Sequence, residues 1–201
     1  MMKQLLFLYF ISLTTLTFGQ KTYIRRDSFD NWQLSLSKKQ NKNVLDYYLL
    51  LPGVLFDCER GLKFDEEGRK SKIKLLDIRN GYIEFTGTYN NLTIALFKDT
   101  LNRKDFIAIS SNVSGRGTSC GGFNMIMEFL QDTVAWKYRN DLLPSKNEEK
   151  PYLEKYYSDL NDMNPYFELP RYGLIVALRE EGSEKPVYRM KWTGTRFEII
   201  N

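Results

Sequence analysis

The chain has 201 residues, a formal net charge of +4, two cysteines and no histidine. Without histidine, it lacks the side chain that most often acts as a general base or binds zinc near neutral pH. Its basic clusters stand beside acidic residues, which indicates a mixed solvated surface rather than a nucleic-acid-binding face.

Residues 1–19 have the layout of a secretory signal peptide. Lys3 supplies a positive charge, residues 5–18 are almost uncharged and apolar, and Gly19 is a small residue before a cut at Gln20. An uncleaved membrane anchor is the alternative, but the apolar run is shorter than the roughly 20 residues of a spanning helix. We expect a mature protein in the periplasm or secreted, without stable membrane insertion.

The mature region, 20–201, has a length typical of one domain, and we expect a single β-rich domain. Two closely packed β units, about 43–143 and 144–201, are the alternative division, because strand-like segments stand on both sides of a helical stretch.

Near the start of this region, Trp32, Leu34 and Leu36 alternate with polar residues. This alternation predicts a short half-buried strand or an arm that lies over the domain. The apolar segment that follows has Asn43 as a candidate N-cap and a Pro-Gly pair after it, so it predicts a short helix near 44–51. A continuous apolar strand is the competing interpretation.

From Ile73 onward, segments rich in β-branched and aromatic residues recur between turn signals. Asn80-Gly81 is the strongest hairpin signal, because both positions tolerate a positive φ. The predicted strands are KIKLLDI, GYIEFTG, LTIALFK, DFIAISS, FNMIMEFL, VAWKYR, YFELP, GLIVALRE, VYRMKW and RFEII. The chain therefore predicts an α+β fold that is mainly an antiparallel β meander.

Between the sixth and seventh of these strands, the sequence predicts an amphipathic helix near 148–160. Pro151 suits a first helical turn, and Glu148 and Glu149 suit the positive end of the helix dipole. The apolar positions have the spacing of one helical face: Tyr152, Leu153, Tyr156, Tyr157 and Leu160.

Glycines surround Cys120 in the segment SGRGTSCGGF, residues 114–123. In an exported chain, two cysteines predict one disulfide, here Cys58 with Cys120. A catalytic thiol would lack the histidine that commonly activates it, and a phosphate-binding loop would lack its Lys-Ser/Thr pair. We expect a structural tether and no catalytic residue, with free or redox-active cysteines as the alternative.

Two oxygen-rich stretches are candidates for other chemistry. The first, beside Cys58, could supply a carboxylate pair for glycoside hydrolysis, but its acids alternate with basic residues and predict a solvated loop. The second resembles a calcium loop without the glycine and distal glutamate of an EF-hand. Neither predicts a metal site, and no cofactor is expected. The residues are Asp57, Glu59, Asp65, Glu66 and Glu67 in the first stretch, and Asp159, Asn161, Asp162 and Asn164 in the second.

Aromatic residues are the candidates for ligand binding, because tyrosine is enriched at recognition surfaces. Tyr152, Tyr156 and Tyr157 could line a groove for a sugar or a peptide, and Arg171 with Tyr172 is a second candidate. The favoured interpretation of the three helical tyrosines is structural: they form the core face of their helix.

Three segments, FELPRYGLIVAL (167–178), DYYLLLP (46–52) and KWTGTRFEII (191–200), resemble a group of uncharacterised secreted proteins of unknown function from Bacteroidetes-type bacteria. The resemblance spans most of the mature chain. It implies a periplasmic or secreted location and transfers no active site.

These features favour an exported, non-enzymatic binding protein, such as an inhibitor, an immunity factor or an envelope accessory subunit, with a protein or glycan partner. The alternative is a carboxylate-dependent hydrolase acting on glycans. That alternative requires two cleft-facing carboxylates within about 10 Å, one of them with a raised pKa.

Overall fold

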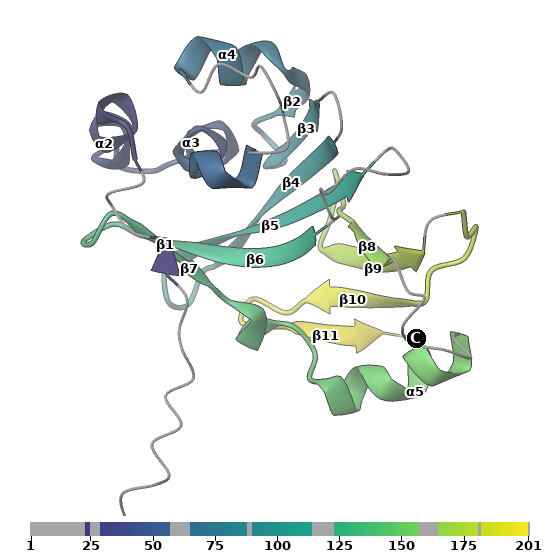
Figure 1. The fold of residues 1–201 in the computed structure, drawn as a ribbon. Coiled ribbons are helices and arrows are strands. Elements are labelled where there is room, and N and C mark those ends of the chain that lie inside the picture. Colours follow the sequence, from purple (N-terminus) through teal and green to yellow (C-terminus); the bar gives the residue numbers. More distant parts are fainter. Residues whose placement is uncertain are drawn as a thin grey trace, which may run out of the picture.

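The computed structural model describes most of the chain and shows two antiparallel sheets with several short helices (Figure 1). The predicted α+β class, mainly antiparallel β, is therefore confirmed. The predicted signal peptide and the Cys58–Cys120 disulfide lie outside the described residues, so they stay predictions. The described residues are 23–24, 29–56, 65–87, 90–113, 123–156, 165–180 and 182–200.

The larger sheet has seven strands in the order β1-β7-β6-β5-β4-β3-β2. From β2 to β7 each strand pairs with the next, which is the predicted meander. At the predicted Asn80-Gly81 hairpin only Gly81 has a positive φ, of 69°. The strands are β1 (Tyr23–Ile24), β2 (Ile73–Asp77), β3 (Tyr82–Thr86), β4 (Asn90–Asp99), β5 (Lys104–Val113), β6 (Phe123–Leu130) and β7 (Ala135–Tyr138).

The smaller sheet has four strands in the order β11-β10-β9-β8. Glycines with a positive φ, Gly182 and Gly194, lie in its last two hairpins, where the sequence predicted turns. The strands are β8 (Pro165–Glu168), β9 (Ile175–Glu180), β10 (Tyr188–Trp192) and β11 (Phe197–Ile200).

The helices are α2 (Asn31–Ser37), α3 (Val44–Leu50), η2 (Gly53–Phe56), α4 (Glu66–Ser71), η3 (Asn140–Leu142) and α5 (Lys146–Tyr156). The predicted short helix is confirmed as α3, with Asn43 as its N-cap. The second predicted helix is confirmed as α5, but it begins at Lys146, so Pro151 lies inside the helix and not in its first turn.

The strand or arm predicted at Trp32, Leu34 and Leu36 is wrong, because these residues form helix α2. The alternation failed as a guide since Gln33, taken as outward-facing, is buried. A capping box starts the helix instead: the Asp30 backbone N–H donates to the Gln33 side chain at 3.1 Å.

The acidic stretch is solvated as predicted where the structure describes it, because Asp65, Glu66 and Glu67 are exposed, but the predicted loop is wrong. Residues 66–71 form helix α4, and Asp65 is its N-cap, accepting a hydrogen bond from the Gly68 N–H at 2.7 Å. Arg69, counted in the sequence as part of a solvated basic cluster, is buried.

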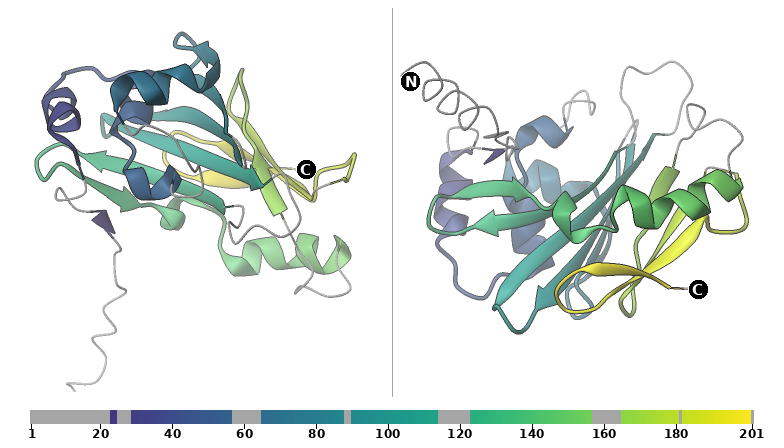
Figure 2. Two further views of the ribbon diagram at one scale, coloured as in Figure 1. Left: turned by 45° about the horizontal axis from the view of Figure 1, so that its top comes forward. Right: turned by 90° about the horizontal axis from the view of Figure 1, so that it is seen from below.

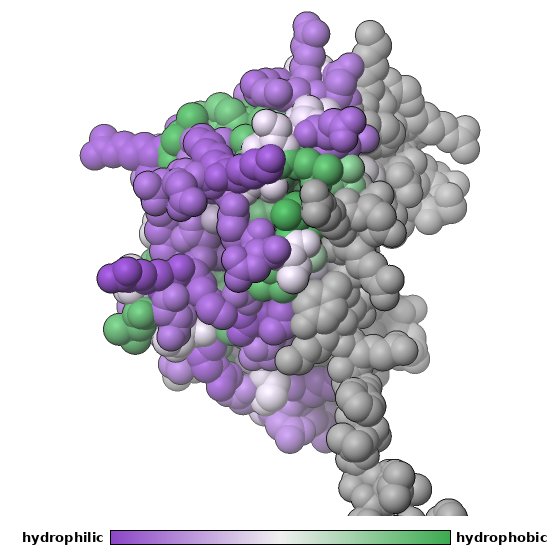
Figure 3. Space-filling model, turned by 90° about the vertical axis from the view of Figure 1, so that its left-hand side faces the viewer, coloured by the Kyte–Doolittle hydropathy of each residue, from purple (hydrophilic) through white to green (hydrophobic). Residues whose placement is uncertain are grey.

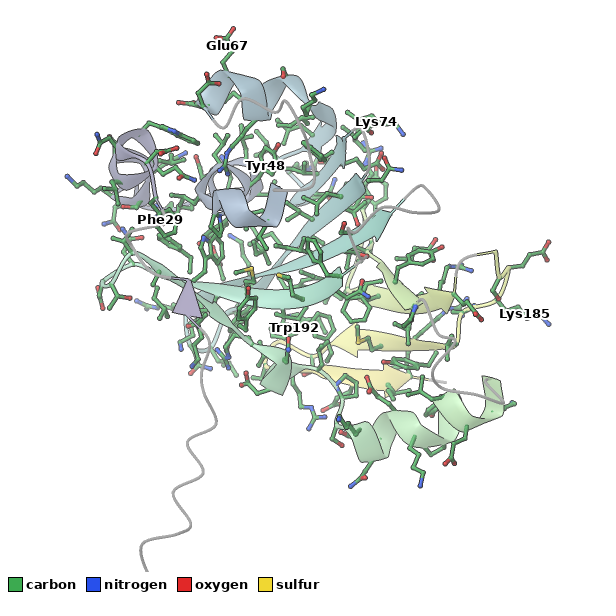
Figure 4. The ribbon with its side chains drawn as sticks, viewed as in Figure 1. Phe29, Tyr48, Glu67, Lys74, Lys185 and Trp192 are labelled. Atoms are coloured by element: carbon green, nitrogen blue, oxygen red, sulfur yellow. The ribbon has the colours of Figure 1, made fainter. Side chains whose placement is uncertain are left out.

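Both faces of the larger sheet are covered, so the molecule has three layers (Figure 2). On β5, Ile107 and Ile109 pack in the cluster beneath the helices, whereas Phe106 and Ala108 pack in the cluster shared with the smaller sheet. Figure 4 shows Tyr48 on the helix-covered side and Trp192 on the opposite side. Because the central strand β5 is buried on both faces from Phe106 to Ser111, its sequence there is a nearly continuous apolar run.

Candidate functional site

A cleft of about 1070 Å³ lies where the α2–α3 connection, the β2–β3 turn, the β4–β5 turn and the β10–β11 turn meet. We call it the end cleft. Because its walls come from turns and strand ends of both sheets and from the α2–α3 connection, it depends on the way the layers are stacked and not on any one segment.

Four basic residues line the end cleft, Lys42, Arg79, Lys98 and Lys191, against one carboxylate, Glu198. None of the four forms an ion pair with a carboxylate of the described residues. Several like charges around one concave surface produce a positive potential that attracts anions.

Lys42 has the most unusual environment of the four. Its residue is only 7% exposed, and its ammonium donates to two neutral acceptors, the Lys39 carbonyl at 2.6 Å and Gln131 Oε1 at 2.5 Å. It also lies 5.4 Å from the centre of the Phe129 ring. Burial lowers the pKa of Lys42, and the negative charge of Asp46 opposes that shift. Asp46 itself forms its ion pair with Lys39, so it does not neutralise Lys42 directly.

A second, smaller cavity of about 560 Å³ adjoins the end cleft, and Lys42 and Lys98 line both. We call it the polar recess. It belongs to the side of the molecule where α2 and the β6–β7 turn lie, and Figure 3 shows hydrophilic side chains over most of that face. Three carboxylates line the recess, namely those of Asp99, Asp105 and Glu128.

Glu128 and Asp105 are both engaged by protein donors. The Lys104 ammonium lies 3.0 Å from Glu128 Oε1, and the Arg139 guanidinium pairs with Glu128 Oε2. Asp105 Oδ2 accepts a hydrogen bond from the Tyr47 hydroxyl at 2.9 Å. Burial, followed by the charge of Asp105, raises the pKa of Tyr47, so this hydroxyl stays a donor.

Asp99 caps the β4–β5 turn. It accepts hydrogen bonds from the backbone N–H groups of Leu101 and Asn102 and from the Asn102 side chain. These bonds from Asn102 lower the pKa of Asp99. Downward shifts are also found for the pKa values of Asp77, Asp141 and Glu148. A lowered pKa favours the ionised carboxylate, whereas a glycan hydrolase requires one carboxyl with a raised pKa.

The binding residues predicted from the sequence lie elsewhere. Tyr152 is half-buried, its ring centre lies 5.9 Å from that of Tyr188, and it lines a third cleft of about 540 Å³ with Glu148 and Arg196. This cleft shares Glu198 and Ile199 with the end cleft. Tyr152 and its neighbour Leu153 both pack against the core cluster that the larger sheet shares with the smaller sheet. The predicted core face of the helix is therefore confirmed for these two positions.

Arg171 and Tyr172 do not line the cleft that Tyr152 lines. The Arg171 guanidinium lies 3.0 Å from Asp77 Oδ2 and 5.1 Å from the centre of the exposed Tyr172 ring. The side chain of Tyr156 and the whole of Tyr157 lie outside the described residues, so their predicted role is untested.

Sequence reasoning missed the four cations of the end cleft, because they come from four separate segments and share no motif. The one local signal is that Lys42 directly precedes the N-cap of a buried helix, a position that draws its side chain toward the core. Within the described residues, no group of acidic side chains is placed to hold a metal ion, and no helix is long and apolar enough to cross a membrane.

No protein-family model, curated protein or solved structure matches this chain. The function therefore has to be argued from the site itself.

Proposed function

We propose that this chain is an exported, non-enzymatic binding protein that holds an anionic ligand in the end cleft. The observation that carries the proposal is Lys42, a buried ammonium bonded to neutral acceptors and lacking a carboxylate partner among the described residues. Export rests on the signal-peptide pattern of residues 1–19.

A buried charge is costly unless it is paired. A carboxylate, sulfate or phosphate of a ligand would supply the missing partner and form a charge-assisted hydrogen bond with Lys42. The same contact would raise the lowered pKa of Lys42 toward its ordinary value. Lys98 and Lys191 would also attract the anionic ligand, and neither forms an ion pair with a described carboxylate that binding would have to break.

Binding without chemistry is favoured over hydrolysis because the carboxylates of the polar recess already serve the fold. Glu128 forms ion pairs with Lys104 and Arg139, and Asp99 accepts a backbone hydrogen bond within the β4–β5 turn. A hydrolase would need one carboxyl kept neutral as a general acid. We therefore expect the protein to bind polyanions and leave them intact.

The test uses two polyanions with different backbones, polyglutamate and polygalacturonate, measured by biolayer interferometry at low salt. The double variant Lys42→Gln with Lys98→Gln should weaken binding at least about tenfold, since each charged hydrogen bond contributes about 1.5–3 kcal/mol. The control, Lys72→Gln with Lys155→Gln, removes the same charge from exposed positions outside the cleft. Equal losses in the two double variants would show non-specific attraction and overturn the proposal.

A further inference from the structure

The described residues expose few large hydrophobic side chains, and two of them, Ile78 and Leu174, line the end cleft. The other four lie within two sequence positions of a residue that lines it. An exposed apolar patch next to a polar cleft marks an interaction surface, because monomeric proteins rarely expose such patches without a function. These side chains are Leu76, Ile78, Leu101, Tyr172, Leu174 and Ile175.

Two of them, Ile78 and Leu174, form part of the cleft wall while 50% and 44% exposed. They come from distant parts of the chain, and an ion pair between Arg171 Nε and Asp77 Oδ2, 3.0 Å long, joins the two segments. The wall of the cleft thus presents two aliphatic groups beside several ammonium groups, in a fixed arrangement.

We propose that the ligand of the end cleft is an acidic peptide segment that also carries aliphatic side chains. This inference rests on the proposed function and adds the chemical class of the ligand. Carboxylates of the peptide meet Lys42, Lys98 and Lys191, and its aliphatic groups cover Ile78 and Leu174, which removes apolar surface from water.

A charged glycan fits this wall less well. Trp192 is the aromatic residue among the described residues lining the cleft, yet it is 2% exposed and its indole N–H donates to the Lys98 carbonyl at 3.0 Å. Its ring face is therefore not free to stack on a sugar. A membrane surface fits less well too, because a flat bilayer cannot reach aliphatic groups that line a concave wall.

The experiment uses the full mature chain and three short fluorescein-labelled peptides, measured by fluorescence anisotropy. The first alternates glutamate with leucine, the second has serine in place of leucine, and the third has glutamine in place of glutamate. The first should bind about tenfold more tightly than the second, and the third should not bind at the same salt concentration.

Variants then locate the apolar contribution. Ile78→Ser and Leu174→Ser should each remove most of the preference for the leucine peptide, while binding of the serine peptide stays unchanged. Leu101→Ser is the matched control, because Leu101 is 82% exposed but does not line the cleft. All three substitutions lie at exposed positions, so the variants should keep the wild-type melting temperature.

The outcomes separate this inference from the proposed function. Equal binding of the leucine and serine peptides, or tighter binding of polygalacturonate than of either, overturns the peptide assignment and leaves an anion-binding cleft. Binding to vesicles of anionic phospholipid that is lost in Leu101→Ser overturns it in favour of a membrane surface. Peptide binding that is unchanged in the double variant Lys42→Gln with Lys98→Gln overturns both proposals.

Discussion

The two faces of the larger sheet are both buried, but different interactions hold their covering layers. On the face shared with the smaller sheet, the core is a cluster of aromatic rings from both sheets, with centroids 5.0–6.0 Å apart. Its members are Phe97, Phe106, Trp192 and Phe197. The hydrophobic contribution of such packing is non-directional and follows the amount of apolar area removed from water.

On the opposite face, the helices are fixed by directional hydrogen bonds to the C-terminal end of α3. Gln33 Nε2 donates to the carbonyls of residues 49 and 51 at 2.8 and 3.1 Å, and Arg69 Nη1 donates to the same pair. The Trp136 indole N–H donates to the carbonyl of residue 50 at 2.9 Å. Three elements thus satisfy the last carbonyls of one short helix, and the charge of Arg69 suits the negative end of its dipole.

The comparison teaches that both covering layers bury an apolar core, but only the helical layer adds a set of polar side chains with specific acceptors. The sheet-on-sheet interface should therefore tolerate more hydrophobic substitutions than the helical layer tolerates changes at its polar anchors. Loss of an aromatic ring should leave a cavity on the first face. Loss of a polar anchor should leave unsatisfied carbonyls on the second.

The largest effect is expected for Trp192→Ala, because the residue is almost fully buried between the sheets. Removing a buried aromatic side chain costs about 3–5 kcal/mol of unfolding free energy. Urea unfolding followed by circular dichroism measures the change, and Tyr172→Ala, at an exposed position, is the control. A loss below about 1 kcal/mol would mean that the aromatic cluster does not hold the two sheets together.

A smaller effect, about 2 kcal/mol, is expected for Arg69→Leu, which keeps apolar packing but removes the charged donor at the end of α3. The carbonyls of residues 49 and 51 then depend on Gln33 alone. Lys70→Leu, on the exposed side of the same helix, should change the free energy of unfolding by less than about 0.5 kcal/mol. An Arg69→Leu variant with an unchanged free energy of unfolding would show that the cost of burying the guanidinium offsets its hydrogen bonds.

The same contrast explains which parts of the structure the sequence predicts. Every strand from β2 to β11 was predicted, because apolar runs between turn residues are a local signal. Helix α2 was mistaken for a strand, since its seven residues bury two polar side chains, Gln33 and Ser37, and the apolar residues between them alternate with a period of two. Arg69 was assigned to the surface because its acceptors lie about twenty positions away along the chain.

The end cleft was beyond sequence reasoning for the same reason. Lys42, Arg79, Lys98 and Lys191 come together only when the two sheets and the α2–α3 connection are stacked. Of the tyrosines singled out in the sequence, Tyr152 packs against the core from α5, whereas Tyr172 is exposed beside Arg171. A buried lysine without a carboxylate partner among the described residues has no local sequence pattern that would identify it.

The N-cap of α3, Asn43, was predicted from the sequence, and it provides the third test. Asn43 Oδ1 accepts hydrogen bonds from the N–H groups of Leu45 and Asp46 at 2.9 and 3.1 Å. Asn43→Ala should lower the free energy of unfolding by about 1 kcal/mol, as for other N-caps. The control is Asn31→Ala, at the exposed first position of α2. If Asn43→Ala lowered the free energy of unfolding more than Arg69→Leu does, the N-terminal end of α3 would contribute more to stability than its C-terminal end.

The smallest effect is expected for Glu148→Gln, which acts on the side of the smaller sheet. Glu148 accepts from the Ser145 N–H at 2.7 Å and lies 3.0 Å from the Arg196 guanidinium, so it joins α5 to the β10–β11 hairpin. The bonds from Ser145, and then Arg196, lower the pKa of Glu148 from 4.5 to about 2. A lowered folded-state pKa means that the ionised side chain stabilises the fold above pH 4.5, and that this contribution is lost as the pH falls toward 2.

The melting temperature of Glu148→Gln should therefore lie slightly below that of the wild type at neutral pH, and the two should converge as the pH falls through this window. Thermal unfolding followed by circular dichroism over a pH series measures the difference. Glu154→Gln is the control, because Glu154 forms only an exposed pair with Lys150, 3.5 Å long, on the same helix. A difference that does not change with pH would assign the effect to helix propensity and not to charge. The hairpin would then be held to α5 by the apolar contacts of Tyr152 and Leu153, the kind of interaction that holds the two sheets together.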